Sequence, residues 1–329
     1  MGKESLDLPP VLAAPPRPWR GRRLVGVIAA HLAVILATAV VVALIQVPRA
    51  SHPFLNPATG PDGLAATLAN PGIGNAEAVA VFSPDGQVLA TSDGNGSTYL
   101  WNLATGQLTA TLTDPGARGV QSVAFSPEGS MLATGDQNGS TYLWDLRTRR
   151  LTATLTNPAT QGVGAVAFSP DGQTLAVADC DGRTYLWNMA TEHLTTALTA
   201  LTVPPDSVGV CVWSAAFSPV GTTLATGDMN GSTYLWNLAT GRLTATLTDP
   251  ASSLGVDAVG FSPAGTTLAT GDWNGSTYLW NVVTGRLTAT LTDPFSEGAG
   301  AVAFSPDSAT LATGDRNGRT YLWNVATGH

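Results

Sequence analysis

The sequence has 329 residues, 44% of them apolar and 7% aromatic, so it can bury a large core and is not that of a disordered protein. The net charge is −8, and because the first 23 residues carry five Lys or Arg against two acidic side chains, the remainder is at about −11. This negative charge would repel the phosphates of a nucleic acid, which excludes nucleic acid as the expected partner. Lys3 is the only lysine, which indicates a GC-rich bacterial coding sequence.

An uncharged apolar segment follows the basic, proline-rich residues 1–23. Residues 24–47 have no formal charge, and as a helix they would span about 36 Å, more than a hydrocarbon core of ~30 Å. The apolar core of a cleaved signal peptide is shorter, about 7 to 15 residues, so we expect an uncleaved transmembrane helix. Most positive charge precedes this helix, which predicts a single-pass membrane protein with a cytoplasmic N-terminus and an extracytoplasmic remainder. Residues 48–63, with four prolines, are predicted to form a semi-rigid stalk.

Beyond the stalk one unit recurs six times. Phe-Ser-Pro begins at Phe82, Phe125, Phe168, Phe217, Phe261 and Phe304. Tyr-Leu-Trp ends 19 residues later in each unit, at Trp101, Trp144, Trp187, Trp236, Trp280 and Trp323. Successive tryptophans are 43, 43, 49, 44 and 43 residues apart, a period typical of a four-stranded sheet and not of a helical repeat.

Turn residues divide one such unit, residues 120–158, into four strands. Ser-Pro-Glu-Gly predicts a type I turn between a first strand ending at Phe125 and a second strand running through 131–134. Asn138-Gly139 predicts a type I′ hairpin turn, followed by a third strand over 140–144. Residues 151–156 alternate apolar side chains with Thr, as a half-buried outer strand does. Each unit is therefore a small antiparallel sheet that buries its faces only when stacked on its neighbours.

At these residues the chain resembles the WD-repeat β-propeller family, over about 265 of the 329 residues, with six matches to Phe-Ser-Pro-Asp-Gly, Leu-Ala-Thr-Gly-Asp and Tyr-Leu-Trp-Asn. The resemblance implies an all-β, six-bladed propeller over residues 64–329. Family blades commonly tie His, Ser/Thr, Asp and Trp into one hydrogen-bonded set. The hydroxyl position matches here in all units but the third, at Thr91, Thr134, Thr226, Thr270 and Thr313. The aspartate position holds Asn in every unit except at Asp181, and the Gly-His is absent, so we expect a partial set.

A lone copy of an outer strand precedes the first full unit. The chain stops just after the third strand of the sixth unit, and residues 64–70, here called the closing segment, repeat the alternation of Leu108, Ala110 and Leu112. We expect the closing segment to pair with 320–323 and to seal the ring as the missing outer strand of the sixth blade. The stalk would then enter from below, so the bottom face is predicted to lie toward the membrane and the top face away from it.

The units differ most at the turn between the second and third strands and at the loop between blades, both predicted on the top face. We interpret these positions as a partner-binding surface, with drift in a tolerant turn as the alternative. Met229, Trp273 and Trp213 are expected to form an apolar cluster over blades four and five. The complete predicted surface is Gln137, Trp213, Met229, Trp273 and Arg316.

Two further sets of residues fall near the top face. Six aspartates recur two residues after the hydroxyl position of the second strand: Asp93, Asp136, Asp179, Asp228, Asp272 and Asp315. They either form an acidic ring that binds a cation or attracts a basic partner, or they cap the turns that follow the second strands. Cys180 and Cys211 lie by register at the top of neighbouring blades, where they form either a disulfide or two free thiols.

Little in the sequence predicts catalysis. The four histidines, His31, His52, His193 and His329, form no ligand cluster and accompany no nucleophile, and there is no phosphate-binding glycine loop. We therefore predict no enzyme activity, no metal and no cofactor, and a protein-binding scaffold whose partner is another protein. The alternatives are an envelope sensor or assembly component that signals through residues 1–23, and a propeller hydrolase.

Overall fold

The structure is a computed structural model that describes residues 68, 71, 79–116, 118–158, 161–200, 210–250, 255–292, 298–317 and 319–329. The predicted cytoplasmic segment 1–23, transmembrane helix 24–47 and stalk 48–63 lie outside these residues. Within the described part of the chain, no helix is long and apolar enough to cross a membrane.

The described residues form six antiparallel sheets whose strands follow one another in chain order. The first three sheets are β1 (Ala80–Phe82), β2 (Val88–Ser92), β3 (Ser97–Asn102) and β4 (Gln107–Thr113); β5 (Val120–Phe125), β6 (Met131–Asp136), β7 (Ser140–Asp145) and β8 (Arg150–Thr156); and β9 (Val163–Phe168), β10 (Thr174–Asp179), β11 (Arg183–Asn188) and β12 (His193–Thr199). The last three are β13 (Val212–Phe217), β14 (Thr223–Asp228), β15 (Ser232–Asn237) and β16 (Arg242–Thr248); β17 (Val256–Phe261), β18 (Thr267–Asp272), β19 (Ser276–Asn281) and β20 (Arg286–Thr292); and β21 (Ala299–Phe304), β22 (Thr310–Asp315) and β23 (Thr320–Asn324).

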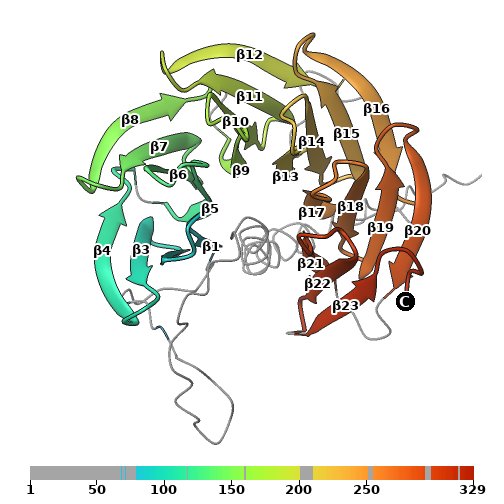
Figure 1. Ribbon diagram of the computed structural model, residues 1–329. Helices are drawn as coiled ribbons and strands as arrows, with labels where there is room; N and C mark the ends of the chain where they lie inside the picture. The colour runs from blue at the N-terminus through green and yellow to red at the C-terminus, as the bar shows by residue number, and fades with distance from the viewer. Residues whose placement is uncertain are drawn as a thin grey trace, which may run out of the picture.

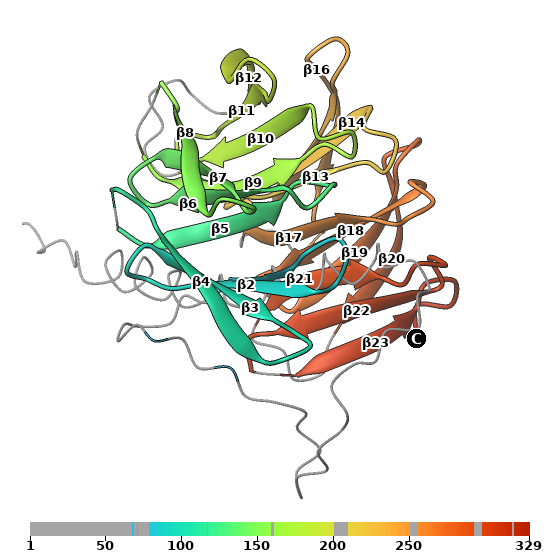
Figure 2. The same ribbon diagram turned by 60° about the vertical axis from the view of Figure 1, so that its left-hand side comes forward.

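The six sheets are the blades of a propeller. Figure 1 shows them arranged around a central axis, with the first strands β5, β9, β13, β17 and β21 nearest the axis and the outer strands β4, β8, β12, β16 and β20 at the periphery. In the turned view of Figure 2 the blades stack side by side, and each twists from its inner to its outer strand. The predicted all-β fold with six repeats is confirmed.

The turns within a blade follow from their residues, with one correction. Gly129 has a φ of 74° and its amide donates to the Ser126 carbonyl at 2.8 Å, which closes the predicted turn between β5 and β6. The predicted type I′ turn at Asn138 is wrong, because only Gly139 has a positive φ there, 84°. The Asp136 carboxylate accepts a hydrogen bond from the backbone N–H of Asn138 at 2.8 Å, and Asn138 keeps a negative φ. A single left-handed residue, Gly139, therefore closes the hairpin.

The hydrophobic core lies between neighbouring blades. Leu112 of the first blade packs in one buried cluster with Leu132 of the second, and Leu143 of the second packs with Leu175 of the third. Consecutive residues of a strand point to opposite sheet faces, so each of blades two to five supplies apolar side chains to both of its neighbours. Stability therefore depends on the stacking of blades around the axis.

A tryptophan on the third strand donates its indole N–H to a threonine hydroxyl on the second strand in five blades, as the hydroxyl and tryptophan positions predicted. The donor–acceptor distances are 2.9 Å for Trp101 to Thr91, 3.2 Å for Trp144 to Thr134, 2.9 Å for Trp236 to Thr226, 3.0 Å for Trp280 to Thr270 and 2.9 Å for Trp323 to Thr313. The third blade has Val177 at this position, and there Trp187 donates to the side-chain oxygen of Asn157 at 3.3 Å.

A carboxylate from the preceding blade accepts a hydrogen bond from the threonine of this Trp–Thr pair. The sequence did not predict this third member. The Thr134 hydroxyl donates to the Asp114 carboxylate at 2.9 Å, and the Thr270 hydroxyl donates to Asp249 at 3.4 Å. Asp114 and Asp249 each directly follow the outer strand of the blade before, so these bonds cross the junction between blades. Burial raises the pKa of both carboxyls to about 8. Asn157, which follows the outer strand of the second blade, is the counterpart of these two acids and bonds to Trp187 and Asp179 of the third blade.

The sixth blade has three strands in the described residues, and its outer edge is open to solvent. Leu322 of β23 is 71% exposed, whereas its counterpart Leu279 in the fifth blade is 1% exposed and packs in one cluster with Phe304 and Leu311 of the sixth blade. Of the closing segment 64–70 only Leu68 is described, and it lies in no strand. The pairing of the closing segment with β23 stays a prediction.

Candidate functional site

The two variable regions of each blade meet at one end of the propeller. In five blades the amide of the residue at the tip between the second and third strands donates to a carbonyl of the loop that leads into the same blade. These bonds are Gln137 to Gly119 at 3.1 Å, Cys180 to Gly162 at 2.9 Å, Met229 to Cys211 at 3.0 Å, Trp273 to Gly255 at 3.2 Å and Arg316 to Gly298 at 3.1 Å. We call this end, made of the tips and the leading loops, the top face.

The six aspartates of the predicted acidic ring are buried and serve mainly as turn caps. Asp93 accepts two backbone amides through Oδ1, from Asn95 at 2.9 Å and Ser97 at 3.0 Å, and the Tyr99 hydroxyl through Oδ2 at 2.8 Å. Asp228 repeats all three bonds, and burial raises its pKa. In the described part of the chain no group of three or more His, Cys, Asp and Glu is arranged to hold a metal ion. Capping of the hairpins accounts for these carboxylates.

Trp273, Arg316 and Asp257 form a tight cluster across blades five and six, here called the rim cluster. The Trp273 indole N–H donates to Oδ1 of Asp257, and Arg316 forms an ion pair with Oδ2 at 2.8 Å. The Arg316 guanidinium also lies 4.7 Å from the centre of the Trp273 ring, a cation–π contact. Burial raises the pKa of Asp257 to about 6, although Arg316 and Trp273 both act to lower it. Two predicted surface residues, Trp273 and Arg316, are therefore partners of each other.

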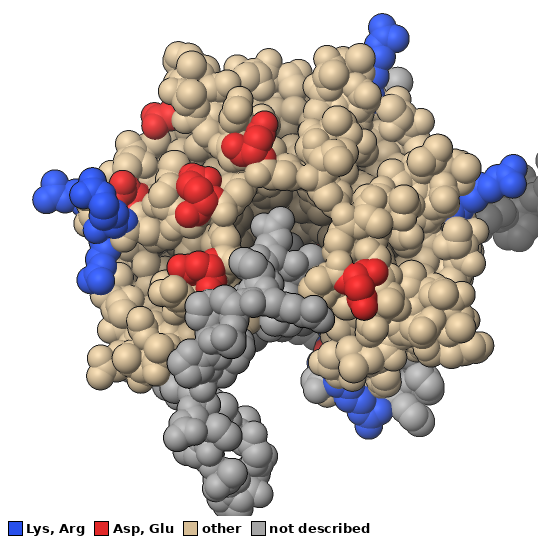
Figure 3. Space-filling model, in the orientation of Figure 1, with Lys and Arg blue, Asp and Glu red and all other residues tan. Residues whose placement is uncertain are grey.

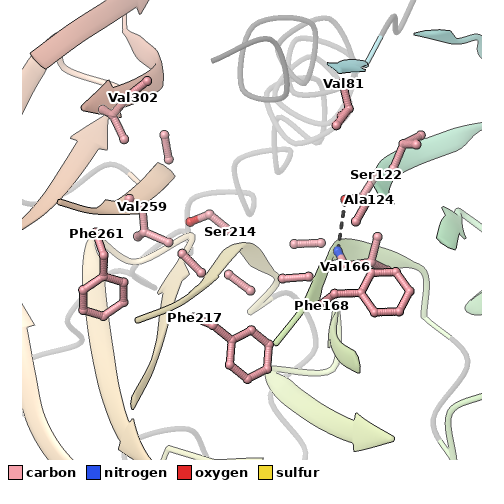
Figure 4. A pocket seen from close by; sticks show the side chains of 18 of the residues that line it. Val81, Ser122, Ala124, Val166, Phe168, Ser214, Phe217, Val259, Phe261 and Val302 are labelled. Carbon is pink, nitrogen blue, oxygen red and sulfur yellow. Dashed lines mark hydrogen bonds between the residues drawn. The ribbon is translucent and has the colours of Figure 1, made fainter. Parts of the chain in front are cut away.

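A cavity of about 480 Å³ lies between the first strands, and Figure 4 shows some of the side chains that line it. Its wall is built from valines and alanines such as Val123, Val166 and Val259, and toward the Phe-Ser-Pro turns it is lined by phenylalanine and proline. Trp213, Asp257 and Trp273 line it at the top-face end. The central channel is thus apolar along most of its length and polar at its upper mouth.

Two of the residues at this mouth, Trp213 and Asp257, occupy a β-bulge that the sequence did not predict. In each first strand from β5 to β21 the register with the second strand skips one residue, and the skipped residues are Gln121, Gly164, Trp213, Asp257 and Gly300. A bulge re-aims the extra side chain, here toward the channel mouth for Gln121, Trp213 and Asp257. The signal was available in the sequence, because this position changes from blade to blade while the flanking positions repeat Val, Ala and Ser.

The predicted apolar cluster forms only in part. Trp213 and Trp273 line the same cavity, but Met229 is not among its lining residues. Met229 and Gln137 are both partly exposed at the tips of their blades. The top face therefore has two components, a channel mouth with two tryptophans and an outer circle of tips.

Cys180 and Cys211 are joined as a disulfide in the structure. The bond links the tip between β10 and β11 of the third blade to the leading loop of the fourth, across 31 positions of the sequence. It anchors the longest leading loop next to Trp213.

Breaking this disulfide should destabilise the propeller. A loop of this length predicts that the Cys180→Ala, Cys211→Ala double variant loses about 3 kcal/mol of unfolding free energy, because its unfolded chain is less restricted. Urea unfolding of both proteins measures the loss, and a non-reducing gel of alkylated cell extract tests whether the bond forms in the cell. Equal midpoints for wild type and double variant, or free thiols in freshly alkylated cells, would contradict the prediction.

The comparison with protein families agrees with the geometry. The model of the WD domain, G-beta repeat, matches residues 73–102, 106–145, 149–188, 191–237, 241–281 and 285–324. Each match after the first begins near an outer strand and ends with the third strand of the next blade, whereas the described residues of the first match contain no outer strand. A search of curated proteins found no match to the chain. Because the six matches cover most of the sequence and coincide with the six blades, the chain belongs to the WD40-repeat family.

Proposed function

We propose that this protein is a bacterial, membrane-anchored scaffold that binds a protein partner through its top face. The observation that carries the proposal is that the tips and the bulge positions carry unlike side chains from blade to blade, on blades whose strands are near copies. Domains of WD40 repeats typically mediate protein–protein interactions. Binding specificity requires unlike residues at fixed positions, and the top face supplies them.

The anchoring part of the proposal rests on the sequence. The apolar residues 24–47 and the positive charge before them support a single-pass protein with an extracytoplasmic propeller. The disulfide between Cys180 and Cys211 fits an oxidising compartment.

The proposal assigns no catalytic step. Asp257 is the only ionisable side chain among the described residues that line the channel, and both of its oxygens are engaged by Arg316 and Trp273. A carboxylate held in this way positions other groups and is poorly placed to act as a base or nucleophile.

Site-specific photo-crosslinking in living cells tests the top face. A photoreactive phenylalanine derivative placed at Met229 should give discrete adducts with a partner, because this side chain stands at a tip of blade four. The matched control is Val220, which is 77% exposed in the turn at the opposite end of the same blade. Adducts that form from Val220 and not from Met229 would contradict the proposal.

A further inference from the structure

Five of the six hairpins between the second and third strands contain an Asn-Gly pair. The asparagines are Asn95, Asn138, Asn230, Asn274 and Asn317. Such a pair cyclises readily, because glycine has no side chain to hinder the approach of its backbone nitrogen to the carbonyl carbon of the asparagine side chain. A fold suppresses this reaction where it holds the asparagine side chain in hydrogen bonds. The hydrogen bonds of each hairpin therefore determine which asparagine reacts.

In blades two and five the asparagine side chain is held through both of its polar atoms. Nδ2 of Asn138 donates to the Tyr142 hydroxyl at 2.9 Å, and Oδ1 accepts the Ser140 amide at 2.8 Å. Asn274 makes the same two bonds within its own hairpin, at 3.4 Å and 2.8 Å. These bonds must break before the side-chain carbonyl carbon can turn toward the next backbone nitrogen.

In blade four the corresponding side chain, that of Asn230, is exposed and has no hydrogen-bond partner among the described residues. The cause is the carboxylate of Asp228. Its Oδ1 accepts the backbone amides of Asn230 and Ser232, and its Oδ2 accepts the Tyr234 hydroxyl. The amide of Gly231 donates to the Asp228 carbonyl at 3.4 Å, longer than an ordinary backbone hydrogen bond. Both reacting groups, the Asn230 side chain and the Gly231 nitrogen, are therefore weakly restrained.

We propose that Asn230 is a site of spontaneous deamidation. Hydroxide takes the proton of the Gly231 amide, and the nitrogen attacks Cγ of Asn230, so that a new C–N bond closes a succinimide ring. The bond from Cγ to Nδ2 breaks, and the leaving nitrogen takes a proton from water and departs as ammonia. Water then opens the ring at either carbonyl and leaves aspartate or isoaspartate at position 230. The reaction consumes water and releases ammonia, and it needs no oxidant and no cofactor.

Blade three shows that the fold accepts a carboxylate at this position. There the hairpin has Asp181 in place of asparagine, and its carboxylate accepts the Arg183 backbone amide at 2.9 Å and the Tyr185 hydroxyl at 2.6 Å. In blade four Asp228 already binds the equivalent hydroxyl, so a new carboxylate would stay in solvent. The aspartate product therefore adds a charge to an intact hairpin, whereas isoaspartate also lengthens the backbone of the turn.

The new charge falls on a surface with few charged tips. Of the two central residues at each tip, only Asp181 and Arg316 are charged. The turns between the first and second strands, at the opposite end of the blades, carry exposed acids at Asp85, Glu128, Asp171 and Asp307. Figure 3 shows acidic side chains around the channel opening on one face of the propeller, with Lys and Arg at its outer rim. A carboxylate at position 230 changes the top face beside Met229. Its effect on a partner rests on the proposed function, whereas the reaction itself does not.

Peptide mapping by mass spectrometry tests this site. The purified full chain is kept folded at mildly alkaline pH in water enriched in heavy oxygen. Asn230 should take up heavy oxygen and become a mixture of aspartate and isoaspartate, about tenfold faster than Asn138 or Asn274, whose hydrogen bonds must first break. The same chain unfolded in urea is the matched control. There all three sites share the sequence Asn-Gly-Ser-Thr-Tyr, so they should react at equal rates.

A variant tests the protecting hydrogen bond directly. Tyr142→Phe removes the acceptor of the Asn138 Nδ2 bond and should raise the rate at Asn138 several-fold, with the rate at Asn230 unchanged. The proposal would be overturned by equal rates at the three sites of the folded chain, or by an Asn230 that stays intact while the unfolded chain reacts. Aspartate without isoaspartate would also overturn it, because hydrolysis without the ring gives aspartate alone. An Asn138 rate that Tyr142→Phe leaves unchanged would contradict the stated protection. None of these results depends on a partner, so they leave the crosslinking test at Met229 independent.

Discussion

Replacing Arg316 by alanine should lower the free energy of unfolding by about 3–5 kcal/mol at about pH 8, because the Asp257 carboxylate is then buried without its cation. The loss should be smaller at about pH 5. Burial raises the pKa of Asp257 to about 6, so near pH 5 the carboxyl is largely protonated and Arg316 contributes less. Urea unfolding at the two pH values, followed by tryptophan fluorescence, measures both losses.

A second variant separates the buried charge from the packing of the arginine. Asp257→Asn combined with Arg316→Ala removes the ionised group, so it should recover much of the stability lost at about pH 8 in Arg316→Ala alone. The stacking of Arg316 on Trp273 is absent from both variants and cancels in the comparison. If Arg316→Ala costs the same at both pH values, and the double variant is no more stable, the ion pair does not stabilise the rim cluster.

Replacing Asp114 by asparagine should make the protein more stable at about pH 8 and change little at about pH 4. In the folded protein burial raises the pKa of Asp114 to about 8, whereas the unfolded chain has the ordinary value of 3.8. Between these values the unfolded state has released a proton that the folded state still holds, so each pH unit lowers the unfolding free energy by up to about 1.4 kcal/mol. Asparagine carries no proton to release, and the difference between variant and wild type should therefore grow from pH 4 to pH 8.

The chain provides a precedent for this change and a control. Asn157 occupies the position of Asp114 in the next blade and bonds there to Trp187 and to Asp179. Asp171→Asn is the control, because hydrogen bonds from Ser169 and the Gln173 amide lower the pKa of this exposed carboxyl. A group with a lowered pKa stabilises the fold above its unfolded pKa, so Asp171→Asn should give no gain at about pH 8. A gain of similar size in both variants would show that Asp114 is not the group responsible.

These two predictions concern junctions between blades, which also support the candidate site. The rim cluster joins blade five to blade six beside the channel mouth, and Asp114 joins blade one to blade two. Variants at the tips, such as Met229, are expected to alter binding with little effect on stability, since those side chains are partly exposed. Stability and binding can therefore be changed separately in this propeller.

The sequence by itself determined what lies within a blade. The strands of the second blade begin and end within one or two residues of their predicted bounds, because short turns such as the one closed by Gly129 set the register of adjacent strands. The bond between Trp144 and Thr134 was also predictable, since Thr134 pairs with Tyr142 and Trp144, two residues further on, lies diagonally across on the same face of the sheet. Six copies of one pattern at a constant period made the propeller readable without a structure.

Only the tertiary structure decided which residues meet between blades and at the axis. Asp257 and Arg316 are 59 positions apart, and nothing local distinguishes this acid as the partner of that arginine. The bond from Thr134 to Asp114 and the inward aim of the bulge residue Trp213 likewise depend on how separate sheets stack. The physical reason is that contacts within a blade are set by hydrogen bonds between strands joined by short turns. Contacts between blades are set by the packing of faces that nearly identical sequences make nearly equivalent.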